Sequence, residues 1–212
     1  MEELWHILKQ ILLVIQLLTA LVGCFYFFRL KHTYWKWFAV YLIIIFIQEL
    51  LLTHILTIPT NTKQFYMLFL GYPLEFIFLY WLYARKSLNR KRLFLFCSII
   101  YLTISFISAY IHTLFSINFN VGTLLLTFLV ILEYLKQIKN EDILRFQENK
   151  MFYINLGVIL FYVGTLPFHV FQKYLYTDYQ TVVEYYYVYF LIANCIMYLL
   201  FAASFIWGEE DS

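Results

Sequence analysis

Long runs of hydrophobic residues, separated by short polar stretches, make up most of the chain. Each run has about 20 residues, the length that an α-helix needs to cross a hydrocarbon core of roughly 30 Å. The runs cover residues 7–28, 37–58, 65–84, 93–115, 119–136, 151–174 and 185–207. This pattern predicts an all-α protein, a seven-transmembrane-helix bundle, in which residues 1–212 form a single transmembrane domain.

The composition supports the same interpretation. Of the 212 residues, 63% are hydrophobic and 13% are charged, and the mean hydropathy is +0.73. A water-soluble domain of this size needs more polar surface. We therefore expect a multi-pass integral membrane protein in a lipid bilayer. The acidic start "MEELW" has no small-residue cleavage pattern behind it, so we expect the first run to be a retained helix.

The positive charges predict the orientation. Twelve of the fifteen lysines and arginines lie in three connections, 29–36, 85–92 and 136–150, and the remaining three are Lys9, Lys63 and Lys173. Cytoplasmic loops carry the excess of Lys and Arg. We therefore expect the N-terminus outside and the C-terminus inside, an arrangement that requires an odd number of spans.

Two carboxylic acids lie deep in the predicted spans. Glu49 lies nine residues before the end of the second run, and Glu75 lies ten residues after the start of the third. Because these runs form a hairpin, both acids are expected at nearly the same depth, close to the middle of the membrane. An acid there costs about 2.5–3.5 kcal/mol and should face protein or water. Removal from water favours the neutral form, so we expect one or both to be protonated.

Polar residues at helical spacing predict polar helix faces. In the fourth run they are Ser98, Tyr101, Ser105, Ser108 and His112; in the sixth they are Asn155, Tyr162, Thr165, His169 and Gln172; in the seventh they are Tyr187, Asn194 and Tyr198. Such faces either pack helices together or line a hydrated interior. The histidines His54, His112 and His169 are expected at similar depths near the outer edge, where a shared pocket, a pH sensor and a metal site stay open.

Two further patterns concern the helices themselves. Pro73 and Pro167 are expected to bend the third and sixth spans beside their polar residues. The stretch 173–190 contains seven tyrosines around the predicted last outer loop. It is expected to form either a lid or an aromatic belt at the membrane interface.

The sequence lacks the residues that several classes of protein require. The seventh run contains no lysine for a retinal Schiff base, and the sequence contains no HxxxH pair for a zinc hydrolase. No Gly-rich phosphate loop, nucleophile elbow or nucleic-acid module is present. The basic clusters fit topology and anionic lipid headgroups better than nucleic acid. We therefore expect no enzyme, no metal or other cofactor and no nucleic-acid partner.

Four stretches resemble a known family. They are "YPLEFIFLYWLY", "FNVGTLLLTFLVILEYL", "MFYINLGVILFYVGTLPFHV" and "NCIMYLLFAASFIW". Residues 64–207 resemble a family of small, uncharacterised bacterial membrane proteins with six or seven spans, common in Bacteroidota and often encoded beside sensor histidine kinases. The resemblance implies a bacterial inner (cytoplasmic) membrane location and, by association, a role in signalling.

Three functions remain as hypotheses. The first is a sensory or signalling protein that binds a small ligand or partner and couples it to a cytoplasmic-side transducer, such as a membrane histidine kinase. The second is a small-solute or proton-coupled transporter, and the third is a structural subunit of a membrane complex, with homo-oligomers possible in each case. The candidate ligand-binding or proton-relay residues are Glu49, Glu75, His54, His112, His169, Gln172, Tyr162 and Asn194.

Overall fold

The protein is all-helical throughout the part of the chain that the structure describes. The structure, a computed structural model, describes residues 1–30, 32–52, 59–110, 115–140 and 145–208. Every regular element in these ranges is a helix, which confirms the predicted all-α fold class. Within the same ranges, six helices are long and apolar enough to cross a membrane: Glu3–Phe27, Thr62–Ser87, Lys91–Ser108, Ile117–Lys139, Lys150–Gln172 and Gln180–Ile206. The chain is thus a multi-pass membrane protein by helix length and composition.

The second predicted span is described only in part. Its helix α2 (Trp35–Leu50) has 16 residues, and residues 53–58 of the predicted span lie outside the described ranges. The count of seven spans and the orientation therefore stay predictions.

Large apolar side chains point outward along the helices. Phe25 is 73% exposed, Ile99 62% and Phe106 74%. A surface of this kind is unfavourable in water but suits contact with lipid acyl chains.

The chain divides into two compact units. The first unit comprises residues 1–56 and 141–212, and the second comprises residues 57–140. The expectation that residues 1–212 form one transmembrane domain stays a prediction.

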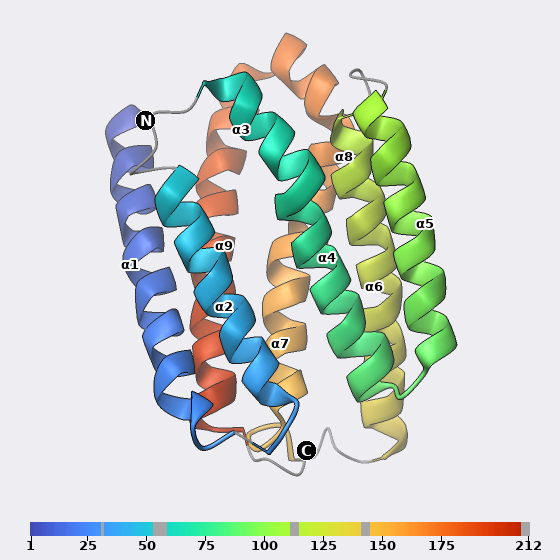
Figure 1. Ribbon diagram of the computed structural model, residues 1–212. Helices are drawn as coiled ribbons and strands as arrows, with labels where there is room; N and C mark the ends of the chain where they lie inside the picture. Colours follow the sequence, from blue (N-terminus) through green and yellow to red (C-terminus); the bar gives the residue numbers. More distant parts are fainter. Residues whose placement is uncertain (31, 53–58, 111–114, 141–144, 209–212) are drawn as a thin grey trace. The chain divides into compact units, whose positions relative to one another are not determined.

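The first unit is a bundle in which α9 packs on both α1 and α7, while α1 also packs on α2 (Figure 1). Its elements are α1 (Glu2–Phe27), α2 (Trp35–Leu50), α7 (Lys150–Val158), the π-helical turn η6 (Ile159–Val163), α8 (Gly164–Asp178) and α9 (Gln180–Ile206). Small residues allow the close approaches, as is usual between membrane helices. A Cβ atom at Gly23 would lie 3.4 Å from the Cβ atom of Ala39, and the Thr19 hydroxyl lies 3.1 Å from the carbonyl oxygen of Tyr198.

The second unit is built on one continuous helical run over residues 60–87. The run consists of α3 (Thr60–Tyr66), the π-helical turn η2 (Met67–Gly71), α4 (Tyr72–Tyr80) and the π-helical segment η3 (Trp81–Ser87). Helix α4 packs against α5 (Lys91–Tyr110) and α6 (Phe115–Lys139). The ring of Phe76 lies so close to Gly122 that an added Cβ atom would lie 2.6 Å from it. Gly122 is therefore the residue that admits this ring.

The two mid-helix prolines each follow a π-helical turn. A proline has no N–H group, and its ring clashes with the carbonyl of the residue four positions earlier. That earlier residue is Phe69 in η2 for Pro73, and Val163 in η6 for Pro167. The wider π turn makes room for the ring. A π turn thus precedes each proline, and the expected bend of the two spans stays a prediction.

The tyrosine-rich stretch 173–190 is helical except at Tyr179, so the connection between the last two predicted spans is shorter than expected, and the lid or aromatic belt stays a prediction. Helix α8 ends at Asp178 and α9 begins at Gln180. The Tyr186 hydroxyl donates to the Gly164 carbonyl at 2.8 Å, and the Tyr189 hydroxyl donates to the Leu160 carbonyl at 2.9 Å. These carbonyls lie where η6 interrupts the regular hydrogen-bond ladder. Two of the tyrosines therefore stabilise the proline-containing helix.

Candidate functional site

A polar cluster surrounds Glu75 in the second unit. Glu75 is half-buried and lies near the middle of the apolar helix Thr62–Ser87. Tyr72 on the same helix and Tyr101 on α5 are both close enough to interact electrostatically with its carboxyl group. Tyr101 is fully buried. A half-buried carboxyl group thus lies near two tyrosine side chains of an apolar helical unit.

Asn118 on α6 extends this cluster. Its Nδ2 donates to the Ser105 hydroxyl of α5 at 3.2 Å, and its side chain also interacts with Tyr101. Asn118 is fully buried, yet its Oδ1 has no hydrogen-bond donor among the described residues. The equally buried Thr123 hydroxyl is also unpartnered within those residues. Because buried polar atoms normally have partners, these two oxygens are suited to accept a hydrogen bond from water or from a small donor. We call Tyr72, Glu75, Tyr101, Ser105 and Asn118 the Glu75 cluster.

The predicted polar face of the fourth span is confirmed over its described part. Ser98, Tyr101, Ser105 and Ser108 are all buried, as a single face at this spacing requires. The fifth member, His112, lies outside the described residues.

A buried carboxylate also lies where the end of η3 meets α6. Glu133 of α6 is 1% exposed and accepts from the Ser87 hydroxyl at 2.6 Å and from Gln137 Nε2 at 3.3 Å. Lys136 Nζ lies 3.5 Å from Glu133 and donates to the Ser87 hydroxyl and carbonyl, each at 3.1 Å. The buried Tyr83 ring also lies within electrostatic range of this carboxylate. A buried charge with so many partners fixes the end of η3 to α6.

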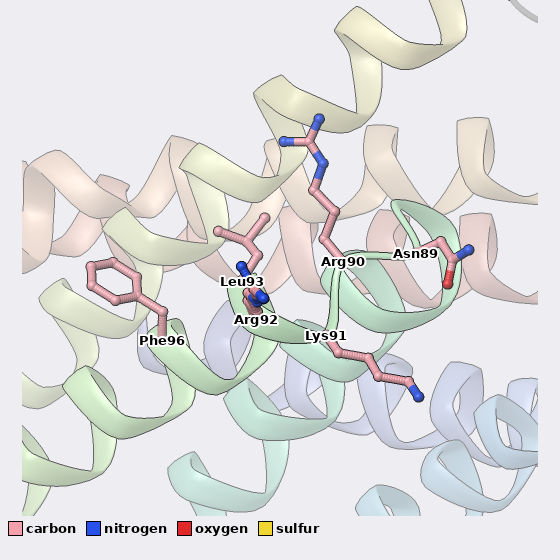
Figure 2. Close-up of a pocket in the computed structure, with 6 residues that line it drawn as sticks. All are labelled: Asn89, Arg90, Lys91, Arg92, Leu93 and Phe96. Carbon is pink, nitrogen blue, oxygen red and sulfur yellow. The ribbon is translucent and has the colours of Figure 1, made fainter.

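A basic surface pocket lies just after η3 in the chain (Figure 2). It has a volume of about 740 Å³ and is lined by Asn89, Arg90, Lys91, Arg92, Leu93 and Phe96. Asn89 has φ 53°, a left-handed conformation that Asn tolerates better than most residues. The Leu88 N–H donates to the Tyr83 carbonyl at 2.8 Å, and the Arg90 N–H donates to the Ala84 carbonyl at 2.7 Å. These two bonds close the helix end and fix the turn from which the basic side chains extend.

The candidate residues of the first unit lie on several helices. Tyr162 is buried, and its carbonyl accepts from the Thr165 hydroxyl at 3.4 Å. His169 and Gln172 are half-buried, and the His169 ring lies 5.8 Å from the ring of Phe168. Asn194 of α9 is half-buried, and its Oδ1 has no partner among the described residues.

The predicted groupings of acids and histidines remain open. Glu49 is half-buried near the end of α2 in the first unit, whereas Glu75 belongs to the second, so their common depth stays a prediction. His54 and His112 lie outside the described residues, so the shared histidine pocket also stays a prediction. Among the residues that the structure describes, no group of three His, Cys, Asp or Glu side chains is placed to hold a metal ion.

The Glu133 site was not predicted from the sequence. Glu133 lies within the fifth predicted span and is followed by Lys136 and Gln137 at i+3 and i+4, a spacing that places all three on one helix face. That pattern was available in the sequence. Its partner Ser87 comes from a different helix, a pairing that only the structure shows.

No family model, curated protein or solved structure matches the chain. Membership of the bacterial family that residues 64–207 resemble therefore stays a prediction.

Proposed function

We propose that the protein is a sensory or signalling protein of the bacterial cytoplasmic membrane. In this proposal a change of charge at Glu75, by protonation or by a small bound ligand, is passed along the helix of residues 60–87 to its basic end. One observation carries the proposal. The same helix bears Glu75 near its middle and Ser87 at its end, and it is bonded to α6 at two places.

Two hydrogen bonds from this helix to α6 limit how a displacement at Glu75 is transmitted. The Tyr80 hydroxyl donates to the Gly122 carbonyl at 2.8 Å, about one turn beyond Glu75. The Ser87 hydroxyl donates to Glu133 at 2.6 Å. The helix between Glu75 and Ser87 is about 18 Å long. A displacement of α4 at Glu75 therefore has to be accommodated at both contacts or move the turn after Ser87.

The π-helical segments give this helix a means of rearrangement. The turn η2 ends at Gly71, one helical turn before Glu75, and η3 lies between Tyr80 and the basic turn. π turns inside α-helices occur frequently at functional sites, where one residue more or less in a turn changes the register of the residues after it. Such a helix can have two packed arrangements, which is what a switch needs.

The expected output surface is the basic turn 88–92. By the positive-inside rule this turn faces the cytoplasm, where a transducer such as a membrane histidine kinase would contact it. A change in charge at Glu75 alters signalling only if the two states of the helix bind that transducer with different affinity.

The second candidate function is proton-coupled or small-solute transport. The unpartnered oxygens of Asn118 and Thr123, within the described residues, favour it, because a transported proton donor needs acceptors along its path. The two functions differ in whether solute crosses the membrane.

Reconstitution into proteoliposomes separates the two. A sensor shows no proton or solute flux. Its affinity for a membrane transducer, measured on the purified complex, changes in Glu75→Gln. A transporter shows flux that Glu75→Gln abolishes. Flux of that kind would overturn the sensory proposal. An unchanged affinity for the transducer in Glu75→Gln would show that Glu75 has no part in signalling.

A further inference from the structure

We propose that the basic pocket after η3 binds an anionic phospholipid, with the phosphate headgroup among Arg90, Lys91 and Arg92 and an acyl chain along α5. The inference is independent of the sensory function, because it concerns the resting surroundings of this turn and not the event at Glu75.

The positive charge of the pocket has no acidic neighbour in the surrounding sequence. Arg90, Lys91 and Arg92 are all exposed, and Arg85 and Lys86 lie in the last turn of η3 just before them. The sequence has no Asp or Glu between Glu75 and Glu133. Glu133 is itself bonded to Ser87, Lys136 and Gln137. The charge of this turn is therefore available to an external anion.

The turn combines a fixed backbone with long, exposed cationic side chains. In Figure 2 the Arg90 and Lys91 side chains extend away from each other, while Leu93 and Phe96 come next along α5. The left-handed Asn89 and the bond from the Arg90 N–H to the Ala84 carbonyl fix the backbone of the turn, and the exposed side chains rotate to meet one phosphate group. Guanidinium groups suit the planar pairing of donors with phosphate oxygens, and a fixed turn lowers the entropic cost of that pairing.

An apolar strip continues from the pocket along α5 and specifies a lipid. Phe96, Ile99 and Phe106 are 60%, 62% and 74% exposed, and their spacing places them on one helix face. Inorganic phosphate would use the cations alone. A ligand with a phosphate group next to a hydrocarbon chain uses both the cations and the strip, and an anionic phospholipid is such a ligand.

The test is native mass spectrometry of the full-length protein in detergent, titrated with short-chain phosphatidylglycerol, phosphatidylcholine or inorganic phosphate. We expect phosphatidylglycerol to bind best. The triple variant R90Q/K91Q/R92Q should lose roughly 5-fold in affinity for each removed charge, on the order of 100-fold in total. Phe96→Ala should weaken the lipid and leave inorganic phosphate unchanged.

The matched control is R29Q/K139Q/R145Q, which removes three exposed cations elsewhere. An equal loss in this control would show a general charge effect and overturn the assigned site. Equal affinity for inorganic phosphate and phosphatidylglycerol, or equal affinity for phosphatidylcholine, would overturn the lipid assignment. If the triple variant fails to fold, the single variant Arg92→Gln must show its roughly 5-fold loss.

Discussion

The Tyr80 hydroxyl of α4 donates a hydrogen bond of 2.8 Å to the backbone carbonyl of Gly122 on α6. The same glycine admits the ring of Phe76, the residue next to Glu75. One backbone position of α6 thus contacts the helix that carries the central carboxyl group through two buried aromatic side chains. The packing of α4 on α6 and the position of Glu75 are therefore coupled.

Gly122→Ala is expected to destabilise the second unit. The new Cβ atom would lie 2.6 Å from the Phe76 ring, which is fully buried and has little room to move. Overpacking of this kind costs about 1–3 kcal/mol. Thermal unfolding in detergent measures it. The control is Gly23→Ala, whose Cβ atom would make only an ordinary 3.4 Å contact with Ala39 and should leave the protein as stable or slightly more so.

Tyr186→Phe and Tyr189→Phe are expected to loosen the proline-containing helix of the first unit. Each removes a hydroxyl that bonds a carbonyl near η6, at 2.8 and 2.9 Å. The loss should be about 0.5–1.5 kcal/mol for each variant. Tyr185→Phe is the control, because Tyr185 is 68% exposed. Hydrogen exchange of residues 159–168 should increase in the first two variants only. Equal exchange in all three would show that these bonds do not stabilise the π turn.

Ser87→Ala is expected to destabilise the protein by about 1–3 kcal/mol, because a buried charge with fewer partners is penalised for part of its lost hydration. The substitution takes one donor from the buried Glu133 carboxylate and one acceptor from Lys136. The unfolding temperature should recover in Ser87→Thr, which keeps the hydroxyl. No loss in Ser87→Ala would mean that Glu133 finds its partners without this helix.

The features that were predicted correctly from the sequence are those that depend on a single helix. The periodicity of Ser98, Tyr101, Ser105 and Ser108 is a property of a single helix, and the structure buries all four. The length of the apolar runs predicted the helices for the same reason. Contacts between different helices were not predicted. The pairing of Ser87 with Glu133, and of two tyrosines of α9 with the carbonyls near Pro167, depends on how helices lie against each other.

The stretch 173–190 shows why composition does not determine the role of a tyrosine. Its tyrosines favour a position at the membrane interface, because tyrosine is frequent there. The hydroxyls of Tyr186 and Tyr189 also serve as donors to carbonyls that a proline and a π turn leave outside the regular ladder. Composition alone does not separate these two uses of the same residue.

The orientation predicts which loops an impermeant thiol reagent reaches in intact cells, with Cys24 replaced by Ser. Cysteines introduced at Asn61 and Asp178 should be labelled from outside. Cysteines at Asn89 and Asn140 should be labelled only after the membrane is opened, since they lie in basic connections. The reverse pattern at any two of these sites would overturn the orientation and place the basic pocket outside.

The coupling of Glu75 to the basic turn can be measured as one distance between two helices. Spin labels at the exposed positions Arg85 on η3 and Ile138 on α6 report the packing of this helix pair by electron paramagnetic resonance. We predict that the distance distribution of the otherwise unchanged protein shifts between acidic and alkaline pH. Glu75→Gln, which keeps the shape and removes the titratable charge, should stay at the acidic distribution throughout. The same pH-dependent shift in Glu75→Gln, or no shift in either protein, would show that the charge of Glu75 does not control the packing of this helix pair.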